Sequence, residues 1–217
     1  MIRKAAVALA AALMAIAGCT TVDPITGERE ANRTANGAII GAIVGAGAGT
    51  LAGGDDRRNA AIGGVIGALA GGAIGNYMDR TYQNLRERLA GTGVSVERIN
   101  QEKILLIFPA DLTFDLNRDN VKSQFLPVLN NTGSILRQYE QTTVDVYGFA
   151  DCTGPDAYNQ DLSERRASNV ATVFASNGVI RQRIVTQGFG ESRPVTQPCS
   201  AAANRRVEVT ISAFTGR

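Results

Sequence analysis

The sequence predicts an α+β domain in its C-terminal half, preceded by a glycine-rich helical hairpin. Glycine recurs at every fourth position in two series within residues 36–76. From Val94 onward, short apolar or alternating runs are interleaved with stretches of helical periodicity, the pattern of strands and helices packed together. The chain divides into a signal peptide at 1–18, a tether at 19–35, the hairpin at 36–76, a linker helix at 77–93 and the α+β domain at 94–217.

The N-terminus has the features of an export signal. Arg3 and Lys4 precede an apolar run that ends in Ile16-Ala17-Gly18-Cys19. The run is shorter than the ~20 residues of a spanning helix, and small residues precede the cysteine, as signal cleavage requires. The stretch resembles a bacterial lipobox, which implies cleavage before Cys19 and its acylation (palmitate or similar chains); an ordinary secretory signal is the alternative. By the sorting rule for such proteins, Thr20 in place of Asp implies the outer membrane.

Composition argues against several functions. The chain has 22 basic and 20 acidic residues, and removal of residues 1–18 takes two basic ones, so the mature chain is formally neutral. Without a basic block, nucleic acid is not an expected partner. Histidine is absent, and one of the three cysteines is assigned to lipid. The commonest general base and the usual zinc ligands are therefore missing, and we expect no enzyme, metal or cofactor.

The glycine series predict close helix packing. Each glycine costs about 1 kcal/mol against alanine in a water-exposed helix, whereas in lipid small residues let helices approach closely. The segment resembles the glycine-zipper hairpins of bacterial envelope lipoproteins. We expect a membrane-associated or self-associating hairpin, which would give a homo-oligomer; a flexible linker and a water-soluble hairpin are the alternatives. The two series are Gly37, Gly41, Gly45, Gly49 and Gly63, Gly67, Gly71, Gly75, separated by a polar turn at 53–59.

Two connecting segments flank the hairpin. Residues 20–35 are polar and contain Pro24 and Gly27, as a tether would. Residues 77–89 predict a polar helix with a narrow apolar stripe, and Gly91 and Gly93 end it. We expect this helix to act as a spacer that lifts the next domain off the membrane. Its stripe consists of Met78, Tyr82, Leu85 and Leu89.

The remaining sequence predicts five strands and two helices. Asn177-Gly178 closes the second helix, and Pro155 opens it as its first residue. The first helix is expected at 121–139. The strands are expected at 94–99, 103–108, 142–149, 184–189 and 207–211.

The segment Val-Asp-Val-Tyr-Gly-Phe-Ala-Asp-Cys-Thr-Gly-Pro at 144–155 begins a recognisable series of motifs. It continues through Asn159 to Arg166, then through Gly-Phe-Gly-Glu-Ser-Arg-Pro at 188–194 and Asn-Arg-Arg-Val at 204–207. Residues 94–215 thereby resemble the OmpA-like C-terminal domain, also present in peptidoglycan-associated lipoproteins and flagellar stator proteins. The resemblance implies helices packed on a mixed β-sheet and non-covalent binding of peptidoglycan.

An acid and an arginine are the main candidate binding residues. Asp151 follows a predicted strand, while Asn159, Ser163 and Arg166 share one face of the following helix. A carboxylate and a guanidinium facing one pocket complement an amino-acid zwitterion. The resemblance implies that the ligand is meso-diaminopimelate in the peptidoglycan stem peptide, with Asp151 meeting its ammonium and Arg166 its carboxylate. From spacing alone, Asp151 could be a turn or cap residue and Arg166 a surface ion-pair partner.

The resemblance also assigns secondary pocket positions to Asn117 and Arg205, with Asn159 orienting a loop or adding a hydrogen bond. Arg165 is expected to be a solvated or structural charge. Two departures from the family stand out. Phe149-Ala150 replaces a pair that commonly begins with histidine, which would remove a polar group from the pocket edge. The segment between Pro194 and Asn204 is short and contains Cys199.

Cys152 and Cys199 are the only cysteines left after lipidation of Cys19. They lie on loops expected to be close together, and the compartment permits disulfides. We therefore expect a disulfide, with two free thiols as the alternative.

These observations predict a lipid-anchored outer-membrane protein whose periplasmic domain ties the membrane to diaminopimelate-type peptidoglycan without catalysis. One alternative makes the glycine hairpin the functional part of a membrane oligomer or pore-like assembly, with the C-terminal domain only an anchor. A wall-modifying enzyme is a third, but the family-like segments supply no nucleophile with a base.

Overall fold

The computed structural model describes residues 20–22, 29–31, 69 and 73–215. The chain forms two compact units, one of Met1–Ala68 with Gly216–Arg217 and one of Leu69–Thr215. Within the first, β1 (Thr20–Val22) pairs antiparallel with β2 (Arg29–Ala31), inside the predicted tether. The predicted signal peptide, Cys19 and nearly all of the glycine hairpin lie outside the described residues, so what the sequence predicts for them stays a prediction.

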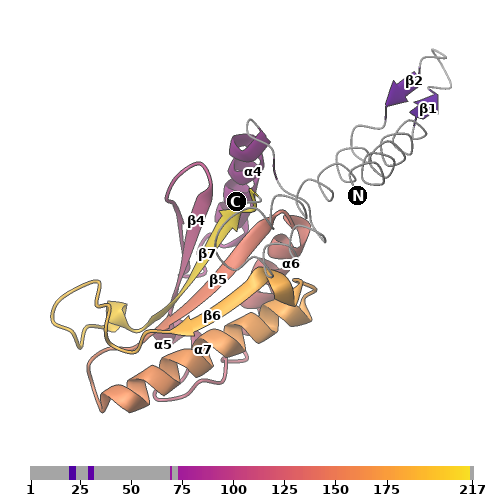
Figure 1. The fold of residues 1–217 in the computed structure, drawn as a ribbon. Helices are drawn as coiled ribbons and strands as arrows, with labels where there is room; N and C mark the ends of the chain where they lie inside the picture. Colours follow the sequence, from indigo (N-terminus) through magenta and orange to yellow (C-terminus); the bar gives the residue numbers. More distant parts are fainter. Residues whose placement is uncertain (1–19, 23–28, 32–68, 70–72, 216–217) are drawn as a thin grey trace, which may run out of the picture. The chain divides into compact units, whose positions relative to one another are not determined.

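A five-stranded mixed sheet organises the second unit (Figure 1). The strand order is β3-β4-β7-β5-β6, antiparallel throughout except for the parallel pair β5 and β6. This confirms the predicted fold class, and every predicted strand is present with bounds shifted by at most two residues. The strands are β3 (Ser95–Arg98), β4 (Lys103–Pro109), β5 (Thr142–Phe149), β6 (Ile184–Gly188) and β7 (Arg206–Ala213).

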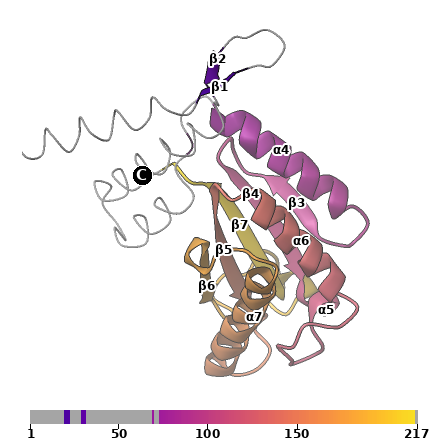
Figure 2. The ribbon, with the colours of Figure 1, turned by 90° about the vertical axis from the view of Figure 1, so that its right-hand side faces the viewer.

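Three helices cover one face of this sheet, and Figure 2 shows them in front of the strands. Alternate residues of β4, β5 and β7 are fully buried beneath the helices, while the residues between them are half-buried. Short 3-10 turns at 181–183 and 202–204 precede β6 and β7. The helices are α4 (Ala73–Arg88), α6 (Leu126–Gln138) and α7 (Asp156–Ser176), with a short α5 (Ala110–Thr113) after β4.

Helix α4 belongs to the core of this unit, contrary to the expected spacer. It begins at Ala73, and Met78 and Leu85 of its apolar stripe are completely buried. The Tyr77 ring packs edge-on against that of Tyr139, and its hydroxyl accepts a hydrogen bond from the amide of Gln141 at 3.0 Å. Burial raises the pKa of Tyr77 to about 12. The apolar stripe is therefore the face by which α4 packs on the rest of this unit.

Two helix starts differ from the predictions. Val121 lies in a β-bridge with Phe114, so α6 begins at Leu126 instead of position 121. The helix-like spacing of the apolar residues Val121 and Phe125 therefore arises in a loop. Phe125 is buried in the core although it precedes the first residue of α6. Pro155 has an extended backbone and immediately precedes the first residue of α7. Gly178 ends that helix with φ of 90°, as expected for the position after a C-cap.

Two glycines allow α7 to lie directly on the sheet. A Cβ atom at Gly148 of β5 would overlap the carbonyl oxygen of Ser163, and one at Gly188 of β6 would overlap the amide of Glu164. The Ser163 hydroxyl accepts a hydrogen bond from the amide of Gly190 at 2.9 Å. This close approach brings the buried face of α7, including Arg166, to the end of β5 where Asp151 lies.

Candidate ligand-binding site

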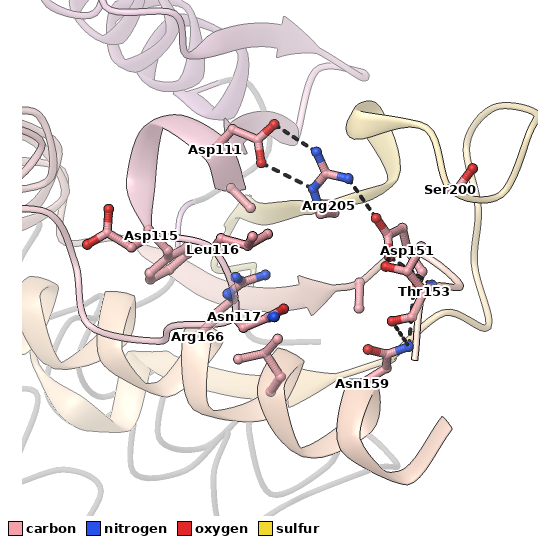
Figure 3. A pocket seen from close by; sticks show the side chains of 14 residues that line it. Asp111, Asp115, Leu116, Asn117, Asp151, Thr153, Asn159, Arg166, Ser200 and Arg205 are labelled. Atoms are coloured by element: carbon pink, nitrogen blue, oxygen red, sulfur yellow. Dashed lines mark hydrogen bonds and ion pairs between the residues drawn. The ribbon is translucent and has the colours of Figure 1, made fainter. Parts of the chain in front are cut away.

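All five residues predicted to bind ligand line one pocket of about 130 Å³ at the end of β5 (Figure 3). The strand end provides the acidic group, α7 provides one wall, and the segments around α5 and before β7 close the rest. The lining residues are Ala110, Asp111, Phe114, Asp115, Leu116, Asn117, Ala150, Asp151, Thr153, Asn159, Leu162, Arg166, Ser200 and Arg205.

Asp151 is almost completely buried, with 4% of its surface exposed. Its Oδ1 accepts hydrogen bonds from the amide of Thr153 at 2.9 Å and from the Thr153 hydroxyl. Its Oδ2 lies 2.6 Å from Nη1 of Arg205. Burial opposes ionisation, but these hydrogen bonds outweigh it and lower the pKa of Asp151. The turn role considered from spacing is therefore real, and it coexists with a place in the pocket.

Arg205 joins two carboxylates. Its Nε and Nη2 donate to both oxygens of Asp111, at 3.1 and 2.9 Å, while Nη1 reaches Asp151. These contacts lower the pKa of Asp111 and raise that of Arg205. Asp111 was not among the predicted site residues, because it lies on α5, a helix too short to give a periodic pattern in the sequence.

Arg166 is the least satisfied charge in the pocket. It is 4% exposed, its Nε donates to the carbonyl oxygen of Arg118 at 2.9 Å, and its guanidinium stacks on the Phe114 ring at 5.0 Å. No carboxylate among the described residues forms an ion pair with it, and neither Nη donates to another described residue. Burial lowers the pKa of Arg166, but an arginine remains charged. The alternative of a surface ion pair is wrong.

The two asparagines have different positions. The Asn159 side-chain amide donates to the carbonyl oxygen of Asp151 at 3.0 Å and to Oε2 of Glu191 at 2.7 Å, so it holds the turn that carries the acid. Asn117 has φ of 55°, in the left-handed region that asparagine tolerates better than most residues. Its carbonyl oxygen accepts a long hydrogen bond, 3.4 Å, from the Tyr158 hydroxyl.

Arg165 and Phe149 both lie outside the pocket. Arg165 pairs with Asp119 at 3.0 Å and with Asp161, so it has the structural role expected of it. Phe149 stacks on Phe189 and beneath the guanidinium of Arg206 at 3.9 Å, and it does not line the pocket. The expected loss of a polar group at the pocket edge therefore does not hold at position 149, whereas Ala150, the second residue of that pair, does line the pocket.

A disulfide joins Cys152 and Cys199, as predicted, with their Cα atoms 5.6 Å apart. It ties the turn after Asp151 to the loop before β7. Asn204 holds the same loop, accepting from the amides of Val195 and Thr196 and donating to the carbonyl oxygen of Cys199 at 2.8 Å. The two segments that carry Asp151 and Arg205 are thus linked covalently and through hydrogen bonds.

The pocket combines an ionised, buried acid with a buried arginine whose terminal nitrogens are free for a ligand. Such a pair can hold a small zwitterion, with its ammonium at the acid and its carboxylate at the arginine fork. No cluster of potential metal ligands occurs in the part of the chain that the structure describes. Within the same residues, no helix has the length and hydropathy required to cross a membrane.

The mixed sheet covered on one face, with this pocket at its edge, defines an OmpA-like domain. Residues 113–208 match the OmpA family, and residues 1–79 match the YMGG-like Gly-zipper family. Probable lipoprotein YiaD of Escherichia coli is 41% identical over 210 residues, covering 94% of this chain and 95% of YiaD. The chain therefore belongs to the family of OmpA-like lipoproteins with an N-terminal glycine zipper.

Other similar proteins match a smaller share of the chain. Outer membrane porin F of Pseudomonas fluorescens is 42% identical over 106 residues, 48% of this chain and 32% of the porin. The cell wall anchor of the T6SS from Pseudomonas aeruginosa superposes with a TM-score of 0.54 at 26% identity, covering 61% of this chain and 99% of the anchor. A putative MotB-like protein from Desulfovibrio vulgaris has the same fold, with a TM-score of 0.58 at 22% identity, over 65% of this chain and 94% of that protein.

Proposed function

We propose that this protein is anchored in the outer membrane by acylated Cys19 and binds diaminopimelate-type peptidoglycan through its periplasmic domain. Its similarity to a probable lipoprotein over nearly the whole chain and to a cell wall anchor over the C-terminal domain supports this function. The match to the zipper family supports self-association through residues 36–76 as part of the same proposal.

The observation that carries the proposal is the guanidinium of Arg166, which is buried in the same pocket as Asp151 and forms no ion pair with any carboxylate that the structure describes. A buried charge without an opposite charge is costly, and a ligand carboxylate would reduce that cost. Four N–H groups on the two Nη atoms are available to it, so a bidentate contact is possible.

Asp151 retains capacity for the ligand ammonium. A carboxylate has about four lone-pair sites, and the three hydrogen bonds from Thr153 and Arg205 leave room for another donor. A diaminopimelate side chain ends in an ammonium and a carboxylate on one carbon atom. We therefore place that end between Asp151 and Arg166, with peptidoglycan bound non-covalently.

The test is calorimetric titration of the full chain in detergent with a stem peptide containing diaminopimelate. Asp151→Asn and Arg166→Gln should each weaken binding tenfold to a hundredfold, because hydrogen bonds to charged groups contribute about 1.5–3 kcal/mol. The double variant should lose less than the sum of the two, since both residues contact one small ligand.

Arg165→Gln is the matched control, because it removes the neighbouring charge on α7 outside the pocket. It should bind like the wild type. A second peptide, with lysine in place of diaminopimelate, keeps the ammonium but lacks the distal carboxylate and should bind much more weakly. Equal binding of both peptides, or unchanged binding by Asp151→Asn, would show that this pocket is not the site.

A further inference from the structure

The Cys152–Cys199 disulfide joins two walls of the binding pocket. Cys152 directly follows Asp151, and Cys199 directly precedes Ser200. Asp151 and Ser200 both line the pocket, and Figure 3 shows the first in the turn after β5 and the second on the loop before β7. The bond therefore fixes the separation of two pocket segments that lie 47 residues apart in the sequence.

Few other contacts hold the loop at 192–203 in place. Its residues are exposed or half-buried, so none of them packs in the core. Asn204, which is buried, accepts a hydrogen bond from the amide of Val195 and donates one to the carbonyl oxygen of Cys199, both at 2.8 Å. The loop thus depends chiefly on Asn204 and on the disulfide.

Arg205 follows this loop and depends on it for its position. Its Nη1 lies 2.6 Å from Oδ2 of Asp151, so the ion pair joins the same two segments as the disulfide. The turn beyond Asp151 is also superficial, since Thr153 and Gly154 are exposed. Once the covalent link is cut, the two segments are held together by polar contacts for which water can compete.

The disulfide is accessible to a reductant. Both cysteines are half-buried, and their neighbours Thr153, Pro198 and Ser200 are exposed. A thiolate of a dithiol can attack one sulfur to form a mixed disulfide, which the second thiol of the same dithiol then resolves. Two electrons and two protons pass to the protein, so Cys152 and Cys199 become thiols while the dithiol becomes a disulfide.

We propose that this disulfide is a redox switch on the pocket, with tight peptide binding in the oxidised chain and weak binding after reduction by a dithiol oxidoreductase. This inference rests on the proposed function. Reduction leaves every binding group present, but the ligand must then order the two segments that carry Asp151 and Arg205. Such ordering costs binding free energy, which the intact bond avoids.

The test measures binding of a dye-labelled diaminopimelate stem peptide to the full chain in detergent by fluorescence anisotropy, before and after treatment with dithiothreitol. Reduction should weaken binding about tenfold, through the cost of ordering side chains on binding. Reoxidation should restore the affinity. Circular dichroism should show a folded chain throughout, because neither cysteine belongs to the hydrophobic core.

The matched control is the double variant with Cys152→Ser and Cys199→Ser. It should bind like the reduced wild type, and dithiothreitol should not change its affinity. The pH at which it loses half its affinity should also lie above that of the oxidised wild type, because Arg205 is no longer held at Asp151. A bond that only stabilises the fold would leave both the affinity and the pH profile of the folded chain unchanged.

Equal affinity of the oxidised and reduced chains would overturn the switch. Unfolding of the reduced chain would overturn it as well, because the bond would then hold the fold and not the pocket alone. If the oxidised wild type does not bind the peptide, the proposed function itself fails, and this inference fails with it.

Discussion

Thr153 and Arg205 together keep ionised the acid that we assign to the ligand ammonium. Asp151 is buried, and burial alone would raise its pKa, so its ionisation depends on the donors around it. Thr153 supplies two of them and Arg205 the third, together with its positive charge. Asp111 holds the guanidinium by two of its nitrogens and leaves one for Asp151. Arg205 is therefore a positioning residue for Asp151.

Replacement of Arg205 by Gln should make ligand binding more sensitive to acid. In the wild type the pKa of Asp151 is lowered from 3.8, so its contribution is present above that value and is lost as the pH falls through the folded-state pKa. Without Arg205, one hydrogen bond and one positive charge that lower the pKa of Asp151 are lost, so this pKa rises. The pH at which half the affinity is lost should therefore move upward, measured by titration of the same stem peptide across acidic pH.

Arg193→Gln provides the comparison for this pH profile. It removes one positive charge from a side chain that stacks on Phe189 and lies outside the binding pocket. Its profile should follow that of the wild type. A midpoint that stays in place or moves downward in Arg205→Gln would contradict the role assigned to Arg205.

For individual residues, the sequence predicts which side chains line the pocket but not which of them form ion pairs with one another. The i, i+4, i+7 spacing and the family motifs locate Asp151 and Arg166 in one pocket. Asp111 was not predicted because it pairs with a residue 94 positions away, and no local pattern encodes that contact. The position of Phe149 was predicted wrongly for a related reason. Phe149 is the last residue of β5, and the face of the sheet on which its side chain lies depends on how β5 pairs with β7, which the local sequence does not reveal.

Helix α4 is an element whose existence, but not whose partner, could be predicted from the sequence. Its spacing of apolar residues predicts one apolar face, but this spacing does not reveal which surface covers that face. The stripe meets α6 and the sheet, where Leu85 and Met78 are fully enclosed. The linker helix is thus an integral part of the folded unit that begins at Leu69.

Truncation of this stripe should therefore unfold the domain more easily. Leu85→Ala should lower the free energy of unfolding by about 2–5 kcal/mol, the usual cost of a large-to-small change in a core. The same change at Leu116, which is 81% exposed, should have little effect. All five tyrosines lie between residues 77 and 158 and tryptophan is absent, so tyrosine fluorescence during guanidinium unfolding reports on this domain. If the two variants were equally stable, α4 would be a spacer after all.

The whole molecule combines two attachments that we assign to different segments, acylated Cys19 and the pocket around Asp151. Multiple acyl chains give stable membrane anchoring, whereas the pocket binds reversibly to a repeating polymer. Local periodicity in the sequence predicts the strands and the long helix α7. It does not predict the path of the chain between Cys19 and the domain, because a glycine-rich segment favours close helix packing without specifying which helix it packs against. Separate tests of the two attachments are therefore needed.

Loss of each attachment should have a distinct outcome in cells. Cys19→Ala should either leave the membrane fraction or accumulate as a precursor that keeps residues 1–18, and it should still co-sediment with peptidoglycan sacculi, because the pocket is intact. Asp151→Asn should stay in the membrane fraction and no longer co-sediment with detergent-washed sacculi. Only the double variant should be soluble in both assays, and mass spectrometry of the N-terminal peptide should find acyl groups on Cys19 of the wild type. Persistence in the membrane of Cys19→Ala that has lost residues 1–18 would instead assign anchoring to residues 36–76, since a hairpin in lipid needs no acyl chain to remain there.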